Sequence, residues 1–223
     1  MSGDRKPPAH IARKLRQEAG FGCCVCGCPI FQYHHIIPYT EDDPHFRHED
    51  MMILCPFPHH YECHDYRESP TLSIEQQRAY KKNPHNIQKG FIEGLLKFRG
   101  NQVKVGYSLL TVKKGINLSI INYNQNSVFE LSIGENNNLE ISGIFYDKEG
   151  NLLATLEKNN FISKEPFPWD IEFKRQWFKI KLKPRDIFLE IDAHKSPIEV
   201  KANVWYKGLH LFIDTRTFNI TTY

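Results

Sequence analysis

The sequence lacks any apolar run long enough to span a membrane, and its N-terminus leads into no signal-peptide core. These two absences predict a cytoplasmic protein that does not enter a membrane. The sequence also has little excess charge, with 29 Lys and Arg against 26 Asp and Glu. Such a balance does not by itself identify a nucleic-acid partner, but clustered cations could still contact phosphates locally.

Cysteine is absent after residue 63, and only two of the eleven histidines follow residue 88. The later part of the chain therefore offers few ligands for a metal. The earlier part contains the pair Cys23 and Cys26, and histidines are interleaved with its cysteines. Cysteines in a secreted protein could form disulfides, but C-x-x-C spacing among histidines favours reduced thiolates that bind a metal.

Four short motifs follow one another in this earlier part. They are C-C-V-C-G at 23–27, H-H-I-I-P at 34–38, D-M-M-I-L-C at 50–55 and H-H at 59–60. This order resembles the HNH, or ββα-metal, endonucleases over roughly residues 12–88. A single C-x-x-C is a weak signal, whereas four parts in this order rarely arise by chance. The rest of the chain resembles no family.

The resemblance implies a structural zinc bound by Cys23, Cys26, Cys55 and one further ligand. His59 is the first choice for that ligand and Cys63 is the alternative, because the segment after Cys55 is one residue longer than the family's common L-C-P-x-H-H. Two more cysteines, Cys24 and Cys28, lie outside the C-x-x-C-G register, and we interpret them as packing residues.

The resemblance also implies a second, catalytic metal, which is Mg²⁺ or else a divalent transition metal. Its expected ligands are His34, His60 and His64. His35 is the expected general base, since a neutral imidazole suits this role near neutral pH. Adjacent side chains on a strand point to opposite faces, so one could reach the metal while the other reaches water. The family's central Asn is replaced by Asp50, which we expect to orient His35 or to touch the metal.

Two helices are predicted around these motifs, at Pro8–Ala19 and from Ser73 to about Lys82, the second begun by a capping box that Gln76 closes. Their cations are candidate DNA contacts, although such charges can also merely solvate a helix face. These candidates are Arg13, Lys14, Arg16, Arg78, Lys81 and Lys82. The loop histidines His45 and His48 are expected to be solvated, with contact to substrate as the alternative.

After Gly90 the pattern changes to alternating apolar and polar residues, which is typical of half-buried strands. Strands are predicted at 103–107, 139–145, 178–182, 187–191, 198–205 and 210–213, with a hairpin turn at 147–151. The predicted fold class is α+β. A small zinc-stabilised ββα-metal nuclease domain at 1–90 is followed by an all-β antiparallel sandwich or roll at 91–223.

The predicted function is metal-dependent hydrolysis of DNA phosphodiester bonds by an HNH endonuclease, with RNA not excluded as a substrate. The alternative is a zinc-stabilised nucleic-acid-binding or protein-interaction module without catalysis. The β domain is expected to bind a protein partner, to mediate homo-oligomerisation or to regulate the nuclease.

Overall fold

The computed structural model describes residues 6–64, 72–174 and 176–222 of the chain. The protein is mixed and mostly β, with a curled antiparallel sheet and few helices. It divides into two compact units, Met1–Ile92 and Glu93–Tyr223. The predicted boundary after residue 90 lies two residues before this division. Among the described residues, no helix is both long and apolar enough to cross a membrane.

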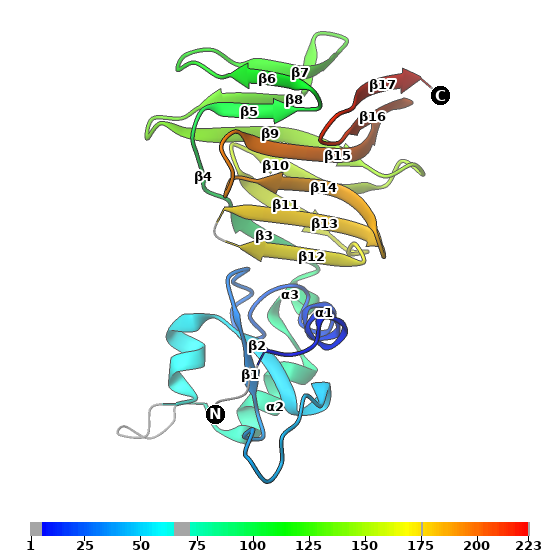
Figure 1. The fold of residues 1–223 in the computed structure, drawn as a ribbon. Helices are drawn as coiled ribbons and strands as arrows, with labels where there is room; N and C mark the ends of the chain where they lie inside the picture. Colours follow the sequence, from blue (N-terminus) through cyan, green and yellow to red (C-terminus); the bar gives the residue numbers. More distant parts are fainter. Residues whose placement is uncertain (1–5, 65–71, 175, 223) are drawn as a thin grey trace. The chain divides into compact units, whose positions relative to one another are not determined.

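The first unit combines a two-stranded hairpin with α-helices and two short helical turns (Figure 1). Its elements are α1 (Ala9–Glu18), β1 (Gln32–His35), the 3₁₀ turn η1 (His48–Asp50), β2 (Met51–Leu54), the π-type turn η2 (Pro56–His60), α2 (Ile74–Lys82) and α3 (His85–Lys89).

Both predicted helices of this unit are confirmed. Helix α1 lies between Pro8 and Ala19, which flank it as its caps. At the start of α2, the Ser73 hydroxyl accepts a hydrogen bond from the backbone nitrogen of Gln76. The Gln76 side chain accepts one in return from the Ser73 backbone, which completes the predicted capping box. Helix α2 ends at Lys82, just before Asn83 and Pro84.

The core of the first unit is built around β2, whose four residues are all buried. Leu15 of α1, its C-cap residue Ala19 and Ile36 pack in the same apolar cluster as β2. Strand β1 pairs antiparallel with β2, so that His34 lies opposite Met52 and His35 opposite Met51. Because β2 is fixed by burial, the pairing also fixes where these two histidines lie.

The second unit consists of strands only, within the described residues. Its strands are β3 (Phe91–Leu95), which spans the division between the units, β4 (Phe98–Arg99), β5 (Gln102–Val105), β6 (Ser108–Thr111), β7 (Leu118–Tyr123), β8 (Asn126–Ile133), β9 (Asn138–Tyr146), β10 (Leu152–Glu157), β11 (Asn160–Lys164), β12 (Asp170–Lys174), β13 (Trp177–Lys183), β14 (Asp186–Asp192), β15 (Ile198–Tyr206), β16 (Leu209–Ile213) and β17 (Phe218–Thr222).

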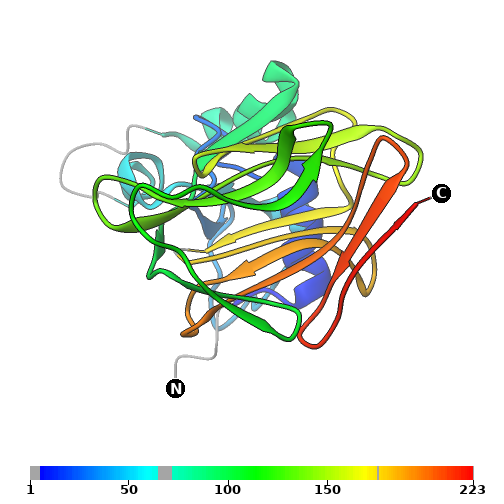
Figure 2. The same cartoon turned by 90° about the horizontal axis from the view of Figure 1, so that it is seen from above.

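These strands form one sheet with the order β12-β13-β14-β15-β9-β10-β11-β3, from which the remaining strands branch. The described pairings are antiparallel except that of β5 with β15. Strands β15 and β9 meet at one residue pair, Trp205 with Tyr146. Figure 2 shows the β unit from above, with its strands curled round an interior. Fully buried phenylalanines such as Phe129, Phe145 and Phe178 fill that interior.

The predicted strands and the predicted turn of the β unit are confirmed, except that the strand predicted at 103–107 ends at Val105 and is followed by a turn. In that turn, Asn151 donates from its backbone nitrogen to the Asp147 carboxylate, and Gly150 takes a φ of 85°. Three further hairpins close with two-residue turns that have positive φ, at 124–125, 158–159 and 207–208. Such turns match the twist of the flanking strands.

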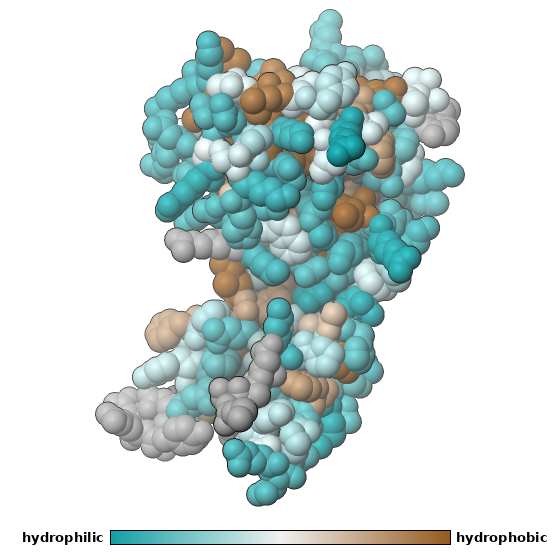
Figure 3. Space-filling model, in the orientation of Figure 1, coloured by the Kyte–Doolittle hydropathy of each residue, from teal (hydrophilic) through white to brown (hydrophobic). Residues whose placement is uncertain are grey.

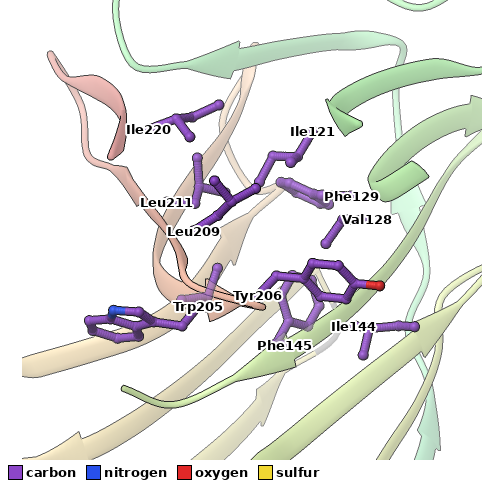
Figure 4. A pocket seen from close by; sticks show the side chains of 11 residues that line it. Ile121, Val128, Phe129, Ile144, Phe145, Trp205, Tyr206, Leu209, Leu211 and Ile220 are labelled. Carbon is purple, nitrogen blue, oxygen red and sulfur yellow. The ribbon is translucent and has the colours of Figure 1, made fainter. Parts of the chain in front are cut away.

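Apolar side chains also line a small hollow within the β unit (Figure 4). Ile121 of β7 and Phe129 of β8 face Leu209 and Leu211 of β16 across it. On the surface, most of the visible face of this unit is hydrophilic, and apolar patches lie toward its upper end in Figure 3. Exposed apolar residues of this unit include Tyr107, Leu109, Ile116 and Ile220. The β unit therefore buries most of its apolar surface and exposes a minority of it.

Candidate metal centres and the histidine hollow

A tight turn presents the first two thiols. The Gly27 backbone nitrogen donates to the Cys23 carbonyl, and the Cys23 nitrogen donates to the Cys28 carbonyl. Gly27 has a φ of 75°, and a Cβ at this position would collide with the Asn86 side chain. The Asn86 amide donates to the carbonyls of Gly20 and Gly27. Asn86 of helix α3 therefore supports the turn, and glycine is required at position 27 because the Asn86 side chain approaches the backbone there.

Four side chains converge on this turn, namely Cys23, Cys26, Cys55 and His59, and their ligand atoms all lie within 4.8 Å of one another. The Cys26 and Cys55 sulfurs are 3.8 Å apart, and the Cys23 sulfur is 3.6 Å from His59 Nδ1. Two sulfurs on a tetrahedral zinc with bonds of about 2.3 Å are separated by about 3.8 Å. The cluster could therefore hold a metal such as zinc.

Burial raises the pKa of the thiols of Cys23, Cys26 and Cys55. A bound cation opposes this effect, because metal coordination deprotonates a thiol outright. Cys24 is buried outside the cluster, and burial raises its pKa to about 12. It therefore stays an uncharged packing residue at neutral pH, in line with the sequence interpretation. The rival ligand Cys63 instead donates its thiol to the His59 carbonyl and lies beside the cluster.

A second group brings together His34, His60 and His64, whose ligand atoms also lie within 4.8 Å of one another. The His34 ring centroid is 5.3 Å from that of His60 and 5.1 Å from that of His64. The backbone nitrogen of His60 donates to the carbonyl of Cys55, five residues earlier. In this wider π-type turn, His59 and His60 reach different clusters.

His34 is the buried member of this group. Burial lowers its pKa to about 4, so the imidazole is neutral at pH 7 and can bind a metal. Its Nε2 lies 3.0 Å from the Gln77 side-chain oxygen. The Gln77 amide nitrogen donates to the Leu72 carbonyl, which directs that oxygen toward His34. His34 Nε2 therefore carries a hydrogen, and Nδ1 carries the lone pair.

His35, the expected base, lies in the same hollow as this group. The hollow is lined by Tyr33, His34, His35, Ile36, Pro38, Tyr39, His60, Cys63, His64, Ile74 and Gln77. We call it the histidine hollow; none of these described lining residues is Asp, Glu, Lys or Arg. His35 Nε2 lies 3.1 Å from the carbonyl of His45. A carbonyl only accepts, so Nε2 carries the hydrogen and Nδ1 of the neutral ring has the lone pair that a base needs.

The structure corrects the role expected for Asp50. Its carboxylate accepts hydrogen bonds from Arg47 at 2.8 Å and from Arg78 at 2.9 Å. These hydrogen bonds lower the pKa of Asp50, and the bond from Arg47 has the largest effect. Within the described chain, none of the contacts of this carboxylate reaches His35 or the three clustered histidines. The Asp50 backbone does lie near His35, because its carbonyl accepts a hydrogen bond from the backbone nitrogen of the next residue, Ile36. Asp50 therefore carries an ion-pairing side chain.

Of the six proposed DNA-contact residues, the structure places one away from solvent. Arg16 is buried and donates to the Tyr33 hydroxyl, so it does not face solvent. Arg78 pairs with Asp50, and Lys81 pairs with Glu18 at 2.7 Å. Lys14 contacts His48, whose other ring nitrogen lies 2.9 Å from Glu18. Of the remaining candidates, Arg13 is half-buried and Lys82 is exposed.

Two residues of the site could not be recognised in the sequence. Gln77 lies on α2, 43 positions from its partner His34, and a glutamine in a helix carries no spacing signal. His45 was expected to be solvated in its loop, but it is buried, with 6 % of its surface exposed. The aromatic neighbours Tyr39 and Phe46 were the available hint that this loop packs.

Comparisons with family models, with curated proteins and with solved structures found no match to the chain. Its function is therefore inferred from the side chains of the site, since function belongs to sites rather than to folds.

Proposed function

We propose that this protein is a metal-dependent endonuclease of the HNH type that hydrolyses DNA phosphodiester bonds, with His35 as general base. The observation that carries the proposal is the presence of two separate ligand sets in the first unit, the Cys₃His cluster and the group of His34, His60 and His64. A purely structural zinc needs four ligands, and the Cys₃His cluster already supplies them. The three clustered histidines beside His35 are left for another task.

The chemistry assigned to the residues follows from their hydrogen bonds. His35 is held through Nε2 by the His45 carbonyl, so Nδ1 accepts the proton of the attacking water. His34, His60 and His64 would hold the divalent ion, with Gln77 fixing the tautomer of His34. When bound there, the ion supplies positive charge that stabilises the transition state and the leaving oxygen.

The test uses the full-length, zinc-loaded protein with supercoiled plasmid DNA. Mg²⁺, Mn²⁺ or Ni²⁺ is added in separate reactions, and EDTA serves as the control. We expect metal-dependent conversion of the supercoiled form to open-circular and linear DNA. A parallel reaction with single-stranded RNA tests the substrate class.

The alternative, a zinc-stabilised binding module without catalysis, is favoured by one observation. The lining of the histidine hollow includes no cation, and Arg78 and Lys81 of α2 are already paired. If folded protein containing zinc leaves plasmid and RNA intact with every metal, the endonuclease proposal fails. A gel-shift measurement on the same samples then decides whether the module binds nucleic acid.

A further inference from the structure

His45 and the segment that carries the base exchange two hydrogen bonds. His35 Nε2 donates to the His45 carbonyl at 3.1 Å. In the opposite direction, His45 Nε2 donates to the Ile37 carbonyl at 3.1 Å. The His45 side chain therefore connects its loop to Ile37, two residues after His35, and the His45 carbonyl binds the His35 ring.

Ring packing and ion pairs hold the same loop in place. The His35 ring lies 5.3 Å from the His45 ring and 5.6 Å from Tyr39, measured between centroids. Just beyond His45, Arg47 donates two hydrogen bonds to the Asp43 carboxylate and one to Asp50. These contacts restrict the loop on both sides of His45, so that its carbonyl has a defined position.

The burial of His45 is not explained by packing alone. Among the described residues, its Nδ1 is a buried nitrogen without a hydrogen-bond partner. Such an atom costs stability, and a phenylalanine would fill the same space without that cost. A histidine at position 45, despite the unpaired Nδ1, is consistent with a structural role for Nε2, which donates to the Ile37 carbonyl.

We propose that His45 is a positioning residue for His35. Its imidazole anchors the loop through Ile37, and this anchor holds the His45 carbonyl at the Nε2 of His35, which keeps the lone pair on Nδ1. The inference rests on the proposed function for its catalytic consequence. The placement of His35 is itself a property of the folded chain and can be measured without substrate.

The decisive variants are His45→Phe, which keeps a ring but removes the donor, and His45→Gln, whose amide can donate to Ile37. His45→Leu is a second variant without a donor, in case the phenylalanine does not fit. His10→Phe, an exposed histidine of α1, is the matched control. Melting temperature and zinc content of each full-length protein verify its fold. The tautomer of His35 is then read from ¹⁵N NMR without added divalent ion.

We expect His35 in the parent, in His10→Phe and in His45→Gln to carry its hydrogen on Nε2. Folded His45→Phe or His45→Leu should show a mixture of tautomers. With DNA, the variants without a donor should lose about 10- to 100-fold in kcat, in the range of lost supporting contacts. Their KM should change by no more than about twofold, and His45→Gln should recover most of the rate.

A folded donor-free variant that keeps the Nε2 hydrogen on His35 would overturn the positioning role. So would one that cleaves at the parental rate. If even the parent cleaves no nucleic acid, the proposed function fails, while the NMR comparison still decides whether His45 positions His35.

Discussion

At the scale of single residues, the site is organised by oxygen atoms that fix the tautomers of two adjacent histidines. The Gln77 side chain fixes His34, and the His45 carbonyl fixes His35. Each oxygen accepts from Nε2 and so leaves the lone pair on Nδ1. A neutral imidazole is required both for the proposed metal ligand and for the proposed general base. Burial lowers the pKa of His34. Burial, and next to it the charge of His64, lowers the pKa of His60.

The first prediction concerns the base. His35→Ala should lower the cleavage rate by at least about 100-fold, since general-base catalysis contributes about 10²- to 10⁴-fold. Affinity for DNA and the melting temperature should stay close to parental values. Single-turnover kinetics and a gel shift measure these quantities, with His10→Ala as the control. Cleavage by His35→Ala at the parental rate would show that the base lies elsewhere.

The second prediction concerns Gln77. Gln77→Leu should weaken binding of a divalent ion at the histidine group by about 10- to 100-fold, because a supporting hydrogen bond to a ligand is lost. Gln77→Glu should bind at least as well as the parent, since a carboxylate oxygen accepts the same bond. Calorimetric titration with Mn²⁺ or Ni²⁺ tests this, with the exposed Gln102→Leu of β5 as the control. Equal affinities for Gln77→Leu and the parent would contradict it.

At the scale of elements, the turn η2 separates two ligand sets that are adjacent in sequence. His59 turns toward the Cys23–Gly27 turn, while His60 joins His34. Across the hairpin, an ion-pair chain runs from Asp43 through Arg47 and Asp50 to Arg78. It connects the loop before η1 with helix α2, so the loop that carries His45 is fixed from two directions.

The third prediction concerns the Cys₃His cluster. Cys55→Ala should release zinc and unfold the first unit. Zinc binding in such sites contributes about 10–16 kcal/mol, which matches or exceeds the whole stability of a small domain, about 5–15 kcal/mol. Cys28→Ser, outside the cluster, should keep both zinc and fold. Metal analysis and circular dichroism measure the outcome, and a parent protein without bound zinc would refute the prediction.

The fourth prediction follows from the lowered pKa of Asp50, which the hydrogen bonds from Arg47 and Arg78 cause. A carboxylate with a depressed folded pKa stabilises the fold above its unfolded value, about 3.9. That contribution is lost as the pH falls through the folded pKa. Amide NMR signals of the 40–47 loop should therefore shift together below about pH 3.9. Asp50→Asn should weaken this transition, and an unchanged transition in that variant would exclude Asp50 as its source.

At the scale of the whole molecule, the two units differ in what stabilises them. The first combines a small apolar cluster with two groups of side chains that could hold a metal. The second has a larger core lined by buried phenylalanines. Its ionic groups also pair on the sheet. Burial alone would raise the pKa of Glu190, but hydrogen bonds from Lys179 and Lys201 outweigh it and lower that pKa.

The fifth prediction is that the β unit folds alone. A fragment of residues 91–223 should show a cooperative β-type melting transition and bind no zinc, because it contains no cysteine and only His194 and His210. A shorter fragment from residue 101 should be less stable, because it loses β3 and the buried Phe98 that pairs with Leu139. Circular dichroism compares them, and an unfolded longer fragment would contradict independence.

The order of motifs in the sequence predicts which side chains of the first unit form clusters. The resemblance of the motif order to HNH endonucleases implied that Cys23, Cys26 and Cys55 belong to one cluster and His34 to another, and the structure groups these side chains in the same way. The helices around them and the alternating strands of the β unit were also predictable, since caps, prolines and the period of apolar residues act over a few positions.

Only the tertiary structure decided which side chains meet across long separations. It selected His59 over Cys63, because the π-type turn sets which residue faces the cysteines. It placed the Asp50 carboxylate against two arginines instead of against His35, and it brought Gln77 to His34 and the His45 carbonyl to His35. These outcomes depend on packing and hydrogen-bond partners contributed by distant segments, and no local pattern of the sequence encodes them.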